Sequence, residues 1–147
     1  MRKCARTDDN HAMLIIGIDP GVTTGFAIWD RADKIFSVVE SMGIIEAMDR
    51  ISEAHRNDVP IMVVFEDARM RGGSKAAAYG AGAIRRECAI WAEFLAYMQT
   101  NGPMPFRAIS PRQKGAKLNA DQFRRLTGWT ERTNEHARDA AMLVFGM

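Results

Sequence analysis

LIIGIDPGVTTGFAIW, residues 14–29, is the stretch that decides the fold. It opens with a short, uninterrupted apolar run, which is typical of a strand buried on both faces of a sheet. Pro20 and Gly21 end that run, and residues 26–29 predict a second strand that pairs with the first as a hairpin. The first strand ends in a carboxylate, Asp19. Burying an acid there is costly unless it has a partner such as a metal ion, so Asp19 is a candidate ligand.

Further apolar runs extend this hairpin into a sheet. Residues 35–39 predict a third strand that turns back on the hairpin, and the apolar spacing over residues 44–57 predicts a helix. Residues 61–65 form a second uninterrupted apolar run, which ends at Glu66. The connection through the helix is long enough for a right-handed crossover, so this run should lie parallel and adjacent to the first. Asp19 and Glu66 would then meet at the carboxyl edge of the sheet, where open α/β sheets place their sites.

The second half of the chain predicts three helices and one short strand. The longest helix carries two apolar stripes. Either one stripe packs on the sheet and the other on a partner subunit, or the whole helix is deeply buried in a monomer. Glycines in its first half indicate close approach by another backbone. The elements are expected at residues 75–100 (capped by Ser74), 106–109, 117–126 and 135–145 (capped by Asn134).

Length and composition favour a single domain in a reducing compartment. The chain has 147 residues, enough for one globular domain over residues 13–147 after a polar segment, residues 1–12, that is expected to be a flexible tail. The two cysteines are far apart in the sequence and fit free thiols. No apolar run approaches the roughly 20 residues that span a bilayer, and no secretion signal is evident, so no membrane partner and a cytoplasmic location are expected.

Charge is distributed unevenly along the chain. Residues 40–67 contain seven acids and two bases, whereas residues 107–125 contain six bases and one acid. This asymmetry favours a polyanion on one side of the molecule, the plainer alternative being solvated helix faces. The candidate residues for binding this polyanion, and for binding DNA if the polyanion is a nucleic acid, are Arg69, Arg71, Lys75, Arg112, Lys114, Lys117 and Arg124.

The last expected helix adds two more candidate ligands. His136 and Asp139 are three residues apart and therefore share a helix face. With Asp19 and Glu66 they form an oxygen-rich set with one imidazole, which suits Mg²⁺ or Mn²⁺ better than a structural zinc ion. Asp67 should point to the other face of its strand and is the weaker candidate. Two such ions, roughly 3.5–4 Å apart, would activate a water and stabilise the leaving oxygen of a phosphodiester.

Three motifs in this order resemble the RuvC-type Holliday junction resolvases of the RNase H-like superfamily: GIDPG at residues 17–21, VVFED at residues 63–67 and HARDAA at residues 136–141. The resemblance covers nearly all of residues 13–147, and the short chain is similar to the compact, phage-encoded branch, which would place it in a host cell's cytoplasm. It implies an α/β fold with a mixed five-stranded sheet, an antiparallel meander plus parallel strands, flanked by helices.

The same resemblance implies an activity. It implies a homodimer, for which the two-striped helix of residues 75–100 is the expected interface. That dimer would cut four-way DNA junctions using Mg²⁺ or Mn²⁺, with two ions in each active site. The catalytic and metal-binding residues would be Asp19, Glu66, His136 and Asp139.

One departure and two alternatives bear on the substrate. Bacterial family members carry an aromatic wedge shortly after the strand glutamate, whereas residues 68–73 read ARMRGG. Either Arg69 or Met70 takes the place of the aromatic wedge, or the substrate range extends to forks, flaps and three-way junctions.

Two alternative functions stay open. One is an RNase-type nuclease of the same fold, whose motifs differ around the last acid. The other is an actin-like or sugar-kinase phosphate-binding domain, for which the chain is too short.

Overall fold

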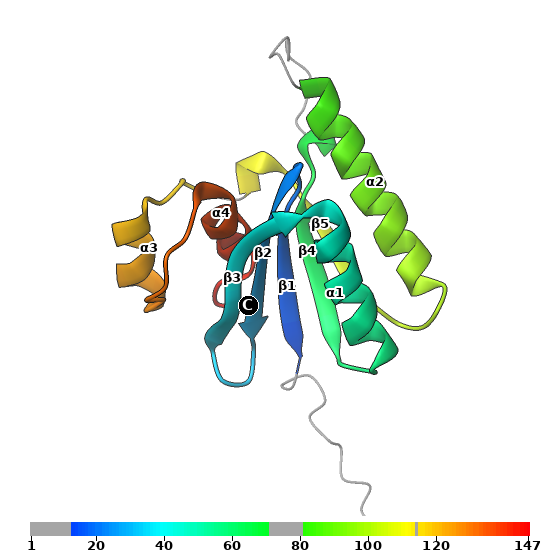
Figure 1. Cartoon of the computed structure of the whole chain (residues 1–147), viewed down its shortest axis with the longest axis horizontal. Helices are drawn as coiled ribbons and strands as arrows, with labels where there is room; N and C mark the ends of the chain where they lie inside the picture. Colours follow the sequence, from blue (N-terminus) through cyan, green and yellow to red (C-terminus); the bar gives the residue numbers. More distant parts are fainter. Residues whose placement is uncertain (1–12, 71–80, 114) are drawn as a thin grey trace, which may run out of the picture.

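A computed structural model describes residues 13–70, 81–113 and 115–147 and shows one mixed sheet flanked by helices (Figure 1). The strand order is β3-β2-β1-β4-β5, with β1, β2 and β3 antiparallel and with β4 and β5 in the parallel part beside β1. The expected RNase H-like α/β arrangement is therefore confirmed. The strands are β1 (Leu14–Asp19), β2 (Thr23–Asp30), β3 (Ile35–Gly43), β4 (Ile61–Glu66) and β5 (Phe106–Ile109), and the α-helices are α1 (Ile44–Arg56), α2 (Ala81–Gln99), α3 (Ala120–Thr127) and α4 (Glu135–Val144).

Some element boundaries differ from those expected. β2 begins at Thr23 rather than residue 26, because Thr23 and Thr24 already pair with Gly43 and Met42 of β3. The hydroxyl of Thr24 also donates to the carbonyl of Gly21, at 2.8 Å, within the turn. α3 begins at Ala120 rather than residue 117, because Asn119 caps it through a capping box. The expected cap Ser74 and the first turns of the long helix, residues 75–80, lie outside the described residues.

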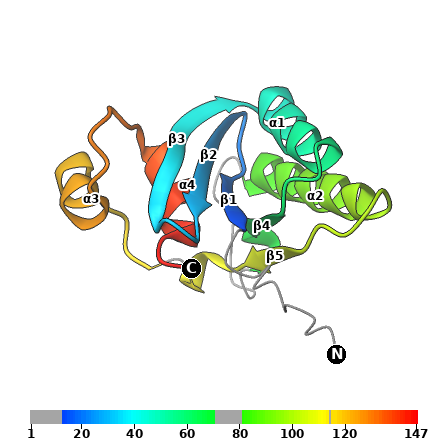
Figure 2. The ribbon, with the colours of Figure 1, turned by 90° about the horizontal axis from the view of Figure 1, so that it is seen from below.

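The two faces of the sheet carry two separate cores. α1 and α2 cover one face, and α4, with α3 beyond it, covers the other (Figure 2). Side chains alternate along β1, so Ile16 and Ile18 belong to the α1–α2 core while Ile15 belongs to the α4 core. This alternation places Asp19 on the α4 face. Helices α1 and α3 thus lie on opposite sides of the sheet.

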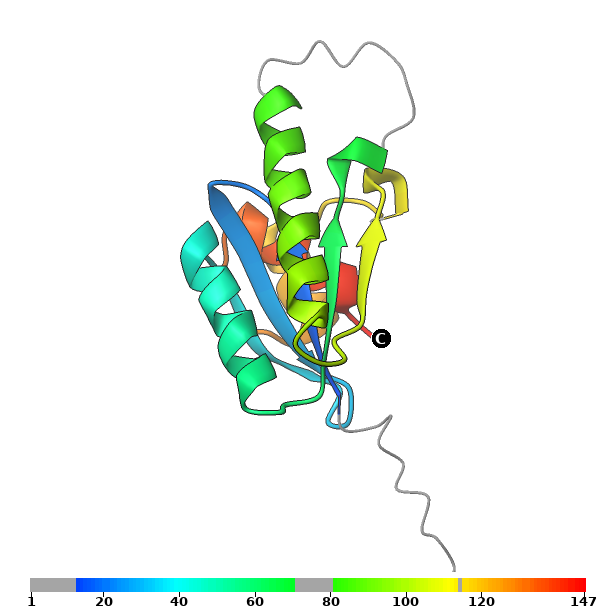
Figure 3. The ribbon, with the colours of Figure 1, turned by 90° about the vertical axis from the view of Figure 1, so that its right-hand side faces the viewer.

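The longest helix, α2, runs alongside the sheet (Figure 3) and has one buried stripe and one exposed stripe of side chains. Trp91 and Leu95 are fully buried against the sheet, whereas Ile90 is 49% and Tyr97 is 65% exposed. Deep burial of the whole helix in a monomer, one of the two expectations, is therefore wrong for the described part. Ile84, which the helical spacing puts in one stripe with Trp91 and Leu95, is also exposed. Neither α2 nor any other described helix is long and apolar enough to cross a membrane.

Candidate active site at the carboxyl edge of the sheet

Two carboxylates lie level with each other at the ends of the central strands. In the parallel pairing of β1 with β4, Ile18 lies beside Phe65, and the next step of this register brings Asp19 level with Glu66. Glu66 lies two residues after Val64, which packs in the α4 core, so both acids belong to the α4 face. The structure therefore places both predicted acids at one edge and on one face of the sheet.

Two glycines bring the backbone of α4 directly against this edge. A Cβ atom on Gly25 would lie 2.0 Å from the carbonyl oxygen of His136, and one on Gly17 would lie 2.2 Å from that of Ala140. Real Cβ atoms do not approach backbone that closely, so glycine is required at both positions for this packing. The contact fixes the first turn of α4 beside the end of β1.

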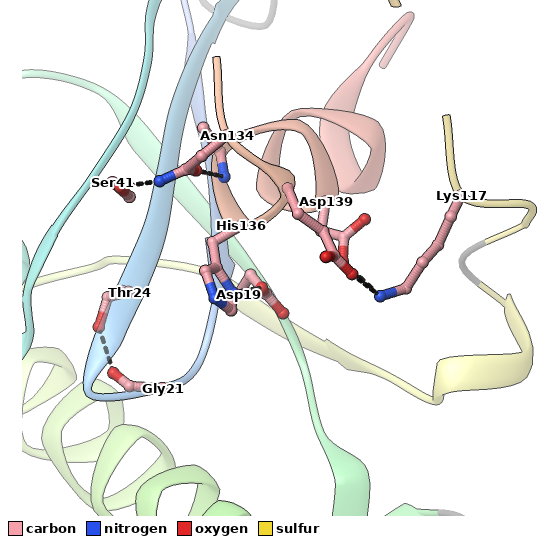
Figure 4. Close-up of polar contacts among 10 residues, drawn as sticks. Asp19, Gly21, Thr24, Ser41, Lys117, Asn134, His136 and Asp139 are labelled. Atoms are coloured by element: carbon pink, nitrogen blue, oxygen red, sulfur yellow. Dashed lines mark hydrogen bonds and ion pairs between the residues drawn. The ribbon is translucent and has the colours of Figure 1, made fainter. Parts of the chain in front are cut away.

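The first predicted pair of site residues meets at this contact. Nδ1 of His136 lies 3.1 Å from Oδ2 of Asp19 (Figure 4). The Asp19 side chain is only 14% exposed, whereas the His136 side chain is 49% exposed. The side chain of Asn134 holds the start of the helix in place. Its Oδ1 accepts from the backbone N–H of Ala137 at 2.9 Å, and its Nδ2 donates to Ser41 Oγ at 2.6 Å. His136 is therefore a solvent-facing group on a fixed backbone.

A lysine places a positive charge beside Asp139, the other candidate ligand on α4. Lys117 lies in the extended segment before α3, not in a helix as expected, and its ammonium contacts Glu135 and lies 3.5 Å from Oδ2 of Asp139 (Figure 4). The hydrogen bond to Glu135 raises the pKa of Lys117 and lowers the pKa of Glu135. Lys117 therefore stays charged beside Asp139, whose side chain is 9% exposed.

The donor set has the chemistry of a hard-cation site, although its side chains are not clustered. Among the described residues, no three His, Cys, Asp or Glu side chains lie close enough together to hold a metal ion. Instead, Asp19 faces His136 and Asp139 faces Lys117. Carboxylate oxygens are the ligands that Mg²⁺ and Mn²⁺ prefer. The backbone positions and donor types fit such an ion, and the side chains would have to turn toward it.

Arg69, a candidate DNA-binding residue, is engaged within the protein. Its guanidinium donates to both carboxylate oxygens of Asp67, at 2.9 Å (Nε to Oδ1) and 2.7 Å (Nη2 to Oδ2). Asp67 is 4% exposed, and the hydrogen bond from Arg69 lowers the pKa of its carboxyl group. Asp67 is therefore held by a neighbouring arginine at the end of β4, and a DNA contact by Arg69 stays a prediction.

Replacing Arg69 by alanine should lower the free energy of unfolding by about 1–2 kcal/mol at pH 7, a value reduced for the partial exposure of Arg69. The stabilisation reflects a depressed native pKa of Asp67, so it is present above the unfolded value of about 3.9 and is lost as the pH falls through the native value. Chemical denaturation at pH 7 and near pH 3 checks this, with the exposed Arg56→Ala as control. A loss that is equal at both pH values would contradict the pairing.

The remaining candidate DNA-binding residues fall into two groups. Arg112, Lys117 and Arg124 are exposed. Arg71, Lys75 and Lys114 lie outside the described residues. Sequence reasoning missed Glu135, the partner of Lys117, although its spacing from Asp139 already puts the two acids on one helix face.

Sequence reasoning also missed the structural role of Arg138. Its Nε donates to the carbonyl of Leu118 at 3.0 Å, and its Nη1 donates to the carbonyl of Thr133 at 3.0 Å. The arginine thereby ties the segment that carries Lys117 to the start of α4. No pattern in the sequence indicates this bridge, because its two closest acceptors are backbone carbonyls of residues outside the helix.

No protein-family model matches the chain, and no curated protein matches it. The RuvC structure of Thermus thermophilus is similar at a TM-score of 0.48 and 20% sequence identity, covering 89% of this chain and 90% of that one. The RNase H-like assignment rests on the sheet order and strand directions described above.

Proposed function

We propose that this chain is a divalent-metal-dependent endonuclease that cuts branched DNA, with four-way junctions as its main substrate. The observation that carries the proposal is the convergence at one sheet edge. Asp19 and Glu66 end adjacent parallel strands, and His136 lies 3.1 Å from Asp19 on a helix pressed against the same edge. Asp139, from the next turn of that helix, is nearly buried.

Four residues would hold the ions: Asp19, Glu66, His136 and Asp139. Bound there, two divalent ions would activate a water and neutralise the leaving oxygen of a phosphodiester. Low exposure of the carboxylates strengthens their attraction for cations. Lys117, 65% exposed and held by Glu135, offers N–H donors to a substrate phosphate beside Asp139.

Selectivity for branch points is supported by an apolar side chain near the edge. The segment after β4 lacks an aromatic residue, and Arg69 is held by Asp67. Met70, in the turn Ala68–Met70, is 49% exposed and is the better candidate to contact unstacked bases at a branch. Its flexible side chain favours a broad range of branched substrates, including forks and flaps, over strict junction specificity.

A homodimer through α2 belongs to the same proposal. Ile90 and Tyr97 lie on its outer face, 49% and 65% exposed. Exposed apolar groups of this size on one helix favour a protein interface. The double variant Ile90→Glu/Tyr97→Glu should shift the protein from dimer to monomer at micromolar concentration in light scattering, with thermal unfolding as a control for folding. A wild-type protein that is already monomeric without DNA would count against the interface.

A cleavage panel tests the proposed activity against its rivals. Labelled four-way junction, fork, linear duplex and RNA–DNA hybrid are incubated with the protein and Mg²⁺ or Mn²⁺, and ATP hydrolysis is followed in parallel. We expect cutting at the branched substrates. Preferred cutting of the hybrid would indicate an RNase-type enzyme, and ATP hydrolysis without cleavage would indicate a phosphate-binding domain of the kinase type.

A further inference from the structure

A second surface lies outside the carboxylate edge, along the segment that joins α3 to α4. One hollow of about 410 Å³ is lined by residues that include Phe123, Arg124, Trp129 and Arg132. A second hollow of about 380 Å³ is lined by residues that include Ser41, Arg132 and Asn134. The two hollows share Arg132 and Thr133 and therefore lie next to each other; we call the pair the α3–α4 groove.

Two arginines of the α3–α4 groove are not paired within the described part of the protein. Arg124 and Arg132 are both exposed, and neither forms an ion pair or side-chain hydrogen bond with a described residue. Of the two acids that line the groove, Glu40 is paired with Arg50, which also pairs with Glu46, and Glu131 is the other. The lining residues therefore carry no net charge, but two guanidinium groups are available to an anionic ligand.

An aromatic wall completes the chemistry of the groove. Trp129 is partly exposed and packs against the α4 core, which includes Phe123, 1% exposed. An indole beside two unpaired guanidinium groups suits a nucleotide, because the ring stacks on a sugar or base while arginines bind phosphate. The volume of the larger hollow is in the range of small-ligand sites.

The groove extends to the start of α4. Arg138 donates to the carbonyl and hydroxyl oxygens of Thr133, at 3.0 and 3.2 Å, and so fixes one of the two residues that the hollows share. The second hollow is also lined by Asn134 and Ala137, at the start of the helix that carries His136. A nucleic-acid strand in the groove would therefore reach the start of α4.

We propose that the α3–α4 groove binds the sugar–phosphate backbone of one DNA arm, with phosphates on Arg124 and Arg132 and a sugar or base against Trp129. This inference rests on the proposed function in taking DNA as the ligand. It assigns binding to two residues, Trp129 and Arg132, that no motif in the sequence indicates. It also explains why the basic charge of α3 is not paired within the domain.

Binding measured without cleavage tests the groove. A fluorescein-labelled four-way DNA junction is titrated with protein in EDTA, and affinity is followed by anisotropy over a range of salt concentrations. Each of Arg124→Ala and Arg132→Ala should reduce the slope of log affinity against log salt by about 0.9, and the double variant by about twice that. Arg56→Ala, an exposed arginine of α1 on the other face of the sheet, is the charge-matched control and should leave the slope unchanged.

Tryptophan fluorescence gives a second readout. Trp29 and Trp91 are 5% and 0% exposed, so quenching on addition of unlabelled junction should come from Trp129. Trp129→Phe should remove the quenching, with residual binding verified by anisotropy at saturating DNA. Unchanged salt slopes in the double variant, or full quenching in Trp129→Phe, would overturn the proposal that DNA binds in the α3–α4 groove.

The two proposals can fail separately. Normal junction cleavage by the double variant, with wild-type salt slope, would refute the groove and leave the nuclease intact. Reduced slopes in a protein that cuts no DNA would support the groove as a DNA-binding surface and refute the nuclease. Equal loss of affinity for duplex RNA would support an anion-binding groove but overturn the assignment to DNA.

Discussion

Replacing Asp19 by asparagine should reduce junction cleavage by about a thousandfold or more, while junction binding is retained. The substitution keeps the shape of the side chain and removes its charge. Asp19 ends the central strand, is 14% exposed and faces His136 at 3.1 Å. A neutral amide there is a poor ligand for Mg²⁺ or Mn²⁺. Single-turnover cleavage and anisotropy with the same labelled junction measure the two effects.

A matched substitution separates the site from general charge effects. Asp49→Asn removes an exposed acid from α1, on the opposite face of the sheet, and should leave cleavage within about twofold of wild type. Thermal unfolding of both variants controls for folding. Wild-type cleavage rates for Asp19→Asn would show that Asp19 is not part of the active site. Loss of junction binding would show that the charge of Asp19 acts on the fold or on the affinity for DNA.

Adding a single methyl group at Gly25 should be the most destabilising small change in the core. The Cβ atom of Gly25→Ala would lie 2.0 Å from the carbonyl oxygen and 2.6 Å from the carbonyl carbon of His136. Both contacts are to backbone, so the start of α4 has to move. We expect a loss of about 3 kcal/mol in the free energy of unfolding, measured by chemical denaturation.

The control for this prediction is Gly82→Ala in α2. No atom lies within 4 Å of the Cβ position there, and the residue is helical, so alanine should stabilise the helix by up to about 1 kcal/mol. Gly25→Ala should also lower cleavage, beyond what the unfolded fraction accounts for, because His136 is displaced from Asp19. Unchanged stability of Gly25→Ala would contradict the backbone contact between α4 and the β1–β2 hairpin.

Much of this architecture is readable from local sequence patterns. The uninterrupted runs of β1 and β4 are short, β-branched and each followed by an acid, so their burial, direction and shared edge follow from hydrophobic pattern and crossover geometry. The start of α4 at Asn134 follows from the preference for a side-chain cap. These signals depend only on neighbouring residues, which is why they survive without tertiary information.

The details of the candidate site depend on contacts between distant segments. Arg69 pairs with Asp67, which lies only two residues away in the sequence. The sequence alone nevertheless does not distinguish an arginine that is paired in this way from one that is available to bind DNA. The position of Lys117 between Glu135 and Asp139 depends on where α3 begins, and the capping box at Asn119 moves that start past the lysine. Long-range packing of this kind leaves no periodic signal.

The most direct test of the proposed activity is a competition cleavage assay. A four-way junction and a linear duplex of the same sequence carry different dyes and are mixed in one tube, and the wild-type protein is added with a titration of Mg²⁺ or Mn²⁺ or with EDTA. We predict that the junction is nicked as the metal concentration rises, that the duplex stays intact, and that EDTA abolishes cleavage. Equal cutting of both substrates, or junction cleavage that persists in EDTA, would contradict a metal-dependent nuclease for branched DNA at the Asp19 edge.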